Sequence, residues 1–213
     1  MRASSALTLA LTGTATAAAL PKIPFVASTD VITLSSTNTA AVVARQSAAK
    51  ACFVIGSTTL PAEVADVAAS LASTVTCSTS KKTISGVPGV TSGSTTFSSI
   101  DFSQSSQTPL QFALSKFATA SPLASTDLQT FQDQLNVYEA TEAGIRSVGG
   151  SLAIKVPKFF LEMQVSRIQT AQGNPPTAAG LQVDHLRDKV LKNAPKEAQS
   201  LLDQVTQLAT QLK

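Results

Sequence analysis

One stretch constrains the fold more than any other: an apolar stripe between residues 128 and 145. Its members recur at intervals of three and four residues, which places them on one face of a helix: Leu128, Phe131, Leu135, Tyr138 and Ile145. Thr126 and Gln129 form a Thr-x-x-Gln capping pattern at its start, and the pair Gly149-Gly150 follows its end. A helix with one apolar face must bury that face against another element, so the sequence predicts helix-on-helix packing.

The rest of the C-terminal half repeats this pattern. Thr108-Pro109-Leu110-Gln111 predicts a short helix through Phe117. The segment 152–168 has an unusually wide apolar surface and is expected to be the central helix, with Pro157 in its first turn or at a kink. Asn174-Pro175-Pro176 is a break, after which helices are expected over 178–193 and from Pro195 onward. The short connections predict an antiparallel helical bundle, so the fold class is mainly α.

Two cysteines, Cys52 and Cys77, lie in segments that the sequence also predicts to be helical. An Ala-rich helix is expected over about 38–55 and a second helix from Pro61, with Val64, Val67 and Leu71 on one face. In an oxidising compartment an even pair of cysteines favours one disulfide. We therefore expect residues 38–77 to form a helical pair held by a disulfide, packed with 109–213 as one domain.

Between these parts, residues 78–108 have a different composition. Ser and Thr make up 16 of these 31 residues, with Gly and Pro interspersed. Such a segment buries too little apolar surface to order itself unaided. It is expected to be irregular, either lying over the helices or forming a short hairpin, and its Ser and Thr are candidates for O-glycosylation.

The first 19 residues have the pattern of a secretory signal peptide. Arg2 precedes an apolar run, and Ala17, Ala18 and Ala19 suit signal peptidase. The apolar run is too short to span a bilayer, so no transmembrane segment is expected, and residues 20–37 are expected to be extended. Removing Arg2 takes the formal net charge from +3 to +2, which is too weak to indicate a nucleic-acid partner.

Catalytic chemistry has few candidates. His185, the one histidine, lies beside Asp184 and one turn before Asp188. Such a pair could act as a general base, but no nucleophile motif accompanies it, so a solvated helix face is the favoured interpretation. No cluster of metal ligands and no cofactor motif is present, and the expectation is a protein that is not an enzyme.

A second candidate is Glu142, which falls in register with the apolar stripe. A carboxylate there could be buried with a raised pKa and mark a ligand-binding cleft. The alternative is a structural ion pair with Arg146, Lys155, Lys158 or Arg167, and this is the favoured interpretation. The third candidate is a tunnel for an acyl chain, because such pockets are apolar and lie between helices. Its candidate lining residues are Tyr138, Glu142, Phe159, Phe160 and Met163, although plain core packing explains the same spacing.

Three features carry a resemblance: the start MRASSALTLALTG, the low-charge Ser/Thr segment, and the Gln-rich helices DLQTFQDQLNVY and SLLDQVTQLATQL. Together they resemble small secreted cell-wall and conidial surface proteins of filamentous fungi, and more loosely the hydrophobic-surface-binding proteins and cell-wall galactomannoproteins. The resemblance implies a non-enzymatic protein that coats or masks a cell wall or spore surface, with wall polysaccharide or other wall proteins as partners. The alternatives are a secreted carrier or effector that binds lipid or host factors, and, least favoured, a hydrolase that uses His185.

Overall fold

The structure is a computed structural model, and it describes residues 50–213. The expected signal peptide, the expected extended segment 20–37 and most of the helix expected over 38–55 lie outside the described residues. Within them, the helices are α2 (Ala62–Leu71), α3 (Pro109–Lys116), α4 (Leu128–Ser147), α5 (Lys155–Ala171), α6 (Val183–Asn193) and α7 (Gln199–Thr210). The strands are β1 (Thr76–Lys82), β2 (Pro88–Ser92) and β3 (Thr95–Thr96).

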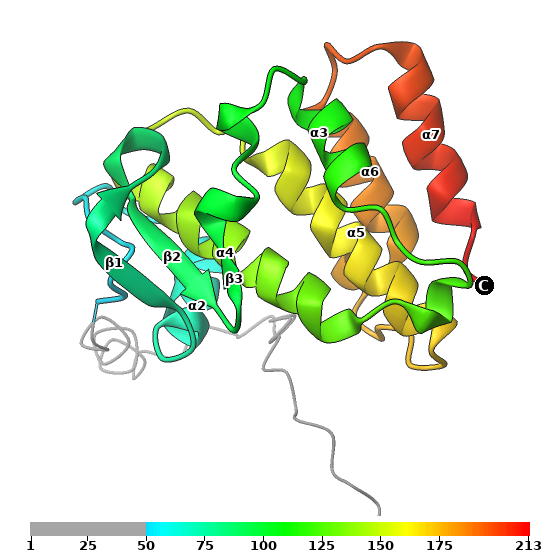
Figure 1. Ribbon diagram of the computed structural model, residues 1–213, viewed down its shortest axis with the longest axis horizontal. Coiled ribbons are helices and arrows are strands. Elements are labelled where there is room, and N and C mark those ends of the chain that lie inside the picture. The colour runs from blue at the N-terminus through cyan, green and yellow to red at the C-terminus, as the bar shows by residue number, and fades with distance from the viewer. Residues whose placement is uncertain (1–49) are drawn as a thin grey trace, which may run out of the picture.

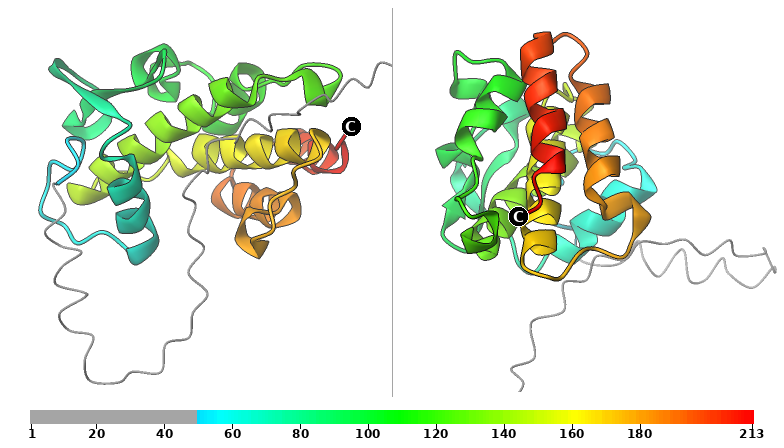
Figure 2. Two further views of the ribbon diagram at one scale, coloured as in Figure 1. Left: turned by 90° about the horizontal axis from the view of Figure 1, so that it is seen from below. Right: turned by 90° about the vertical axis from the view of Figure 1, so that its right-hand side faces the viewer.

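The prediction of a mainly helical fold with one disulfide is confirmed. Helices α4 and α5 lie side by side through the middle of the molecule (Figure 1). Helices α3 and α6 pack on α5, and α7 packs on α6 and α3. At the other end, α2 and the small sheet pack on α4 (Figure 2). The antiparallel bundle as an overall arrangement stays a prediction.

The segment 78–108 is not irregular, contrary to expectation. Strand β1 pairs antiparallel with β2, and β2 pairs antiparallel with β3. The segment is ordered because its few apolar side chains are buried against α4 and the neighbouring elements. The high content of Ser and Thr hid this in the sequence. The buried side chains are Val87, Val90, Phe97, Ile100 and Phe102. The short hairpin considered from the sequence is present as β1–β2.

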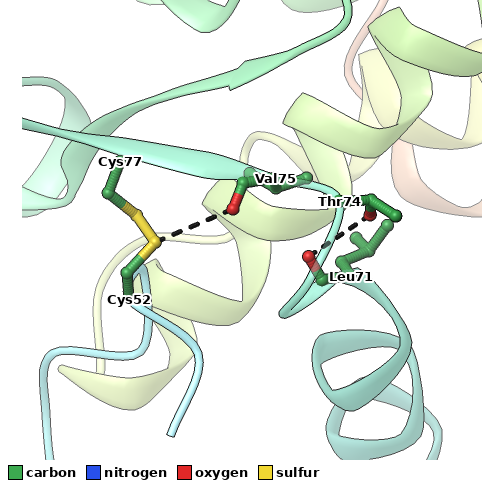
Figure 3. Close-up of a disulfide and its surroundings, with 5 residues drawn as sticks. All are labelled: Cys52, Leu71, Thr74, Val75 and Cys77. Atoms are coloured by element: carbon green, nitrogen blue, oxygen red, sulfur yellow. Dashed lines mark hydrogen bonds between the residues drawn. A yellow bond between two sulfur atoms is a disulfide. The ribbon is translucent and has the colours of Figure 1, made fainter.

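The disulfide joins Cys52 to Cys77, as predicted, but it does not join two helices. Cys77 lies in β1, and Cys52 lies in a turn of the segment that precedes α2 (Figure 3). The two Cα atoms are 6.0 Å apart. The helical interpretation was wrong for Cys77 because the β-branched Thr76 and Thr79 beside it favour a strand over a helix. The disulfide therefore connects the segment 50–58 to the edge of the sheet.

The segment 50–58 docks on the C-terminal half of α4. The backbone N–H of Gly56 donates to Ser147 Oγ at 2.9 Å, and the N–H of Thr58 donates to the Ser147 carbonyl at 3.0 Å. A Cβ on Gly144 would lie 2.6 Å from both the Phe53 carbonyl oxygen and a methyl group of Val87. Gly144 therefore lets this segment and the sheet approach the helix closely.

The helix boundaries test the capping patterns found in the sequence. Thr108 caps α3 as predicted, and its hydroxyl accepts from the Gln111 N–H. The expected cap of α4 was wrong by one residue, because Asp127 is the N-cap and accepts from the Gln129 N–H at 3.0 Å. Thr126 instead accepts from the Ala120 N–H. Pro157 lies in the first turn of α5, and no helix among residues 50–213 is long and apolar enough to cross a membrane.

Candidate functional site: a charged cluster between α4 and α5

Five charged side chains meet where α4 faces α5, and we call them the carboxylate cluster. Helix α4 contributes Glu139, Glu142 and Arg146, and α5 contributes Lys158 and Glu162. Residues 139, 142 and 146 share one face of α4 because they are three and four positions apart, and the same spacing aligns 158 with 162 on α5. The cluster therefore lies along the seam between the two helices.

Glu142 is the best-connected member. Arg146 Nε donates to one of its carboxylate oxygens at 2.8 Å, and Lys158 Nζ lies 3.3 Å from the other. Its side chain is only 4% exposed, so both charges are needed to compensate the lost hydration. The structural ion pair favoured from the sequence is formed with two of the four candidate partners. Lys155 and Arg167 form no ion pair with it.

Lys158 bridges the carboxylates. Its ammonium nitrogen lies 3.2 Å from Glu162 Oε1 as well as 3.3 Å from Glu142 Oε2. Burial acts to lower the pKa of Lys158, but Glu162, Glu142 and Glu139 together raise it above its usual value. The lysine is therefore positively charged at neutral pH.

Glu139 is the member of the cluster whose pKa is shifted toward neutrality. Burial, and next the negative charge of Glu162, raise the pKa of Glu139 to about 8, against the opposing effect of Lys158. Glu162 is therefore the neighbouring group with the largest effect on Glu139. With three carboxyl groups around Lys158 and Arg146, keeping one proton leaves two carboxylates facing two cations.

A cationic surface adjoins this cluster. The ring of Phe159 has Lys158 Nζ at 3.9 Å from its centroid, with Lys189 at 5.6 Å and Lys155 at 5.8 Å. Burial and the nearby Arg146 lower the pKa of Lys155. Phe159 is half-buried, so it covers the stems of these lysines and interacts with their charges through its ring face.

The other candidate lining residues lie elsewhere. Tyr138 is fully buried, its hydroxyl donates to the Ile100 carbonyl at 2.6 Å, and its ring packs against Phe97 and Phe117 with centroids 5.1 and 5.7 Å away. Phe160 and Met163 are fully buried in the core. The structure thus brings Glu142 and Phe159 together through Lys158, and it places Tyr138 in an aromatic cluster of its own. A ligand-lining role for these residues stays a prediction.

Sequence reasoning missed Glu139 and Glu162. The signal was present, because Glu139 is one turn before Glu142, and Glu162 follows Lys158 at the four-residue spacing of a helical ion pair. What the sequence did not contain was the register of α5 against α4, which decides that these two carboxyls face one another. His185 is exposed on α6, where Asp184 and Asp188 both pair with Arg187.

This arrangement can hold one proton between two carboxyl groups beside two cations. General acid–base catalysis needs such a group with a pKa near neutrality. In residues 50–213 no group of three or more His, Cys, Asp or Glu side chains could hold a metal ion, and both cysteines are in the disulfide. The geometry observed is that of an inter-helix ion-pair network. Burial and the negative charge of Glu162 favour the protonated form of Glu139 beside it.

Comparison with known proteins adds a family but no activity. No curated protein and no solved structure shows significant similarity to this chain. A protein-family model, described as a domain of unknown function (DUF7143), matches residues 54–213, which are nearly all the residues that the structure describes. The match includes the sheet, α2 and every later helix. The chain therefore belongs to the DUF7143 family.

Proposed function

We propose that this protein is a non-enzymatic, secreted protein of a fungal cell wall or spore surface, which coats or masks that surface. The observation that carries the proposal is the disulfide Cys52–Cys77, because disulfides form and persist in oxidising compartments such as the cell exterior. It accords with the signal-peptide pattern of the first 19 residues.

The surface around the sheet supports the same role. Hydroxyl side chains are exposed along β1, in the loops of the sheet and ahead of α3, where a glycosyl transferase could reach them. They are Thr76, Thr79, Ser80, Ser85, Ser94, Ser98, Ser99, Ser103, Ser106 and Thr108. Sugars there would lie on a folded scaffold. Those on the sheet would extend from the end of the molecule that the sheet occupies, whereas those ahead of α3 would lie nearer to its middle (Figure 1).

The lipid-carrier alternative has weaker support. The carrier role would need an acyl-chain tunnel beside Phe159, Phe160 and Met163, which was one candidate from the sequence, but Phe160 and Met163 are fully buried in the core. Two pockets in residues 50–213 are lined by other residues. We therefore rank the surface role ahead of the carrier role.

The test is mass spectrometry of the mature protein secreted by its own host, under native and denaturing conditions, followed by fractionation of wall and medium. The surface role predicts a ladder of hexose additions on peptides from 76–108 and recovery in the wall fraction. A mass of a few hundred daltons that disappears on denaturation, without hexoses, would instead support the lipid carrier. An unmodified, ligand-free protein found in the medium alone would contradict both.

A further inference from the structure

Arg167 is a buried arginine near the C-terminal end of α5. Its residue is 2% exposed, although arginine is rarely buried without a paired charge. One terminal nitrogen donates to Gln164 Oε1, and the other donates to the Gln211 carbonyl at 2.9 Å. Arg167 Nε is buried and has no hydrogen-bond partner.

No carboxylate among residues 50–213 forms an ion pair with Arg167. Burial lowers the pKa of Arg167 to about 10, so it remains a cation at neutral pH. Gln164, itself 1% exposed, is held by its amide nitrogen on the Phe117 carbonyl at 2.7 Å. The guanidinium is thus fixed in position by neutral acceptors, and no side chain among residues 50–213 supplies a counter-charge to it.

This cation lines a pocket of about 300 Å³ between α3, α5 and α7. Thr119 and Ser121 carry hydroxyl groups, and Lys213 and Gln211 also line the pocket. The remaining wall is largely apolar and includes Leu114, Leu123 and Leu208. No acidic side chain lines it.

We propose that this pocket, which we call the Arg167 pocket, binds a small organic carboxylate with a short apolar body. The guanidinium fork matches the two oxygens of a carboxylate, and a bound anion would supply the missing counter-charge. The leucine side chains would contact the apolar body. A doubly charged inorganic anion would leave this wall without contacts, so a monocarboxylate fits better than phosphate. The volume lies at the lower end of the range for ligand pockets, which limits the ligand to a small molecule.

Direct binding can be measured by titrating the purified, full-length mature protein, labelled with 15N, with sodium hexanoate. The proposal expects saturable changes at the Arg167 Nε–H signal and at the amides of 118–121 and 211. Two matched probes separate the contributions: hexanol has the apolar body without charge, and inorganic phosphate has charge without the body. Both are expected to bind at least about tenfold more weakly than hexanoate. Equal binding of hexanol or of phosphate would overturn the carboxylate assignment.

Two variants locate the site. Arg167→Lys keeps the charge but loses the fork, and it should weaken hexanoate binding by about tenfold or more. Leu208→Phe leaves Arg167 intact but fills part of the wall, and should also weaken binding, so a folding defect of one variant does not decide the outcome. Arg187→Lys, on the outside of α6, is the matched control and should bind as the parent protein does.

Three results would overturn the proposal. Hexanoate could cause no change in these signals, or it could cause changes only at the lysines around Phe159. The third concerns Asp30, the only acidic residue before residue 50. A shift of the free protein's Arg167 Nε–H signal in Asp30→Asn would show that the chain itself supplies the counter-charge.

Discussion

Tyr138 is a buried polar residue whose ionisation would report unfolding. It is the only tyrosine, the chain has no tryptophan, and its hydroxyl is buried on the Ile100 carbonyl. Burial, and next the charge of Asp101, raise the pKa of Tyr138 well above its usual value. The folded protein therefore keeps the phenol protonated, whereas the unfolded chain loses the proton near pH 10.

We expect the protein to be destabilised above about pH 10, because only the unfolded state then releases the tyrosine proton. The contribution is complete below that pH and decreases as the pH rises through the folded-state value. The phenolate absorbance should therefore appear together with loss of helical circular dichroism as the pH is raised. Ionisation of Tyr138 while the helices remain intact would contradict this.

Tyr138→Phe removes the hydroxyl and leaves the buried Ile100 carbonyl without its donor. An unsatisfied buried acceptor costs about 1–3 kcal/mol of the free energy of unfolding, which urea denaturation followed by circular dichroism would measure. Phe117→Leu would serve as the comparison, since it alters the same aromatic cluster without removing a hydrogen bond. A change below about 0.5 kcal/mol for Tyr138→Phe would show that water replaces the phenol.

Glu139 predicts a pH dependence near neutrality. Its folded pKa is raised to about 8, so its stabilising contribution is complete below the unfolded value near pH 4 and is lost as the pH rises toward 8. Glu139→Gln should therefore be more stable than the parent protein at pH 8, by about 1 kcal/mol or more, with little difference at pH 4. Urea denaturation at both pH values tests this. The exposed Glu63→Gln should not change the difference between the two pH values.

At the scale of elements, close backbone approach fixes how the sheet and the segment 50–58 meet α4. Gly144→Ala should destabilise the protein by about 1–3 kcal/mol, because the new methyl group would overlap the Phe53 carbonyl and Val87. Thermal or urea unfolding would measure it. Gly180→Ala is the control, because nothing lies within 4 Å of a Cβ there. Equal effects of the two substitutions would show that this approach is looser than described.

The disulfide constrains the same region. Replacing Cys52 and Cys77 by Ser should lower the free energy of unfolding by about 3 kcal/mol, as expected for a separation of 25 residues. A reductant should destabilise the parent protein similarly and leave the double variant unchanged. If reduction leaves the parent's unfolding midpoint in place, the segment 50–58 is held mainly by its contacts with Ser147.

The elements also show what the sequence could predict. Helices α3 and α4 followed from apolar spacing and caps, and α5 followed from its apolar surface, because these are local properties of the chain. The sheet did not, since β1 is mostly exposed and its pairing with β2 depends on contacts distant in sequence. The same limit applies to the site: Glu142 and two of its partners were foreseen, but the opposition of Glu139 and Glu162 depends on inter-helix register. Arg167 had a signal, because it continues the buried spacing of Phe160 and Met163 on α5.

At the scale of the whole molecule, the buried apolar residues form one continuous core that includes α2, the sheet and the later helices. We therefore expect residues 50–213 to unfold in one cooperative transition. Circular dichroism, which reports the helices, and tyrosine fluorescence, which reports the contact with the sheet region, should give the same midpoint in urea. Two separated midpoints would divide the chain into the sheet end and the helical end.

Strand β1 lies at the edge of the sheet, and this would matter if the protein is packed densely on a surface, as we propose. An exposed strand edge can pair with the edge of a neighbouring copy and start aggregation. Here Lys81 and Lys82 are exposed on β1, and its pairing with β2 is interrupted between Cys77 and Lys82. Two copies meeting edge to edge would bring these lysines together. The charge and the interrupted pairing therefore disfavour edge-to-edge association, and in the proposed surface role sugars on Thr79 and Ser80 would add bulk there.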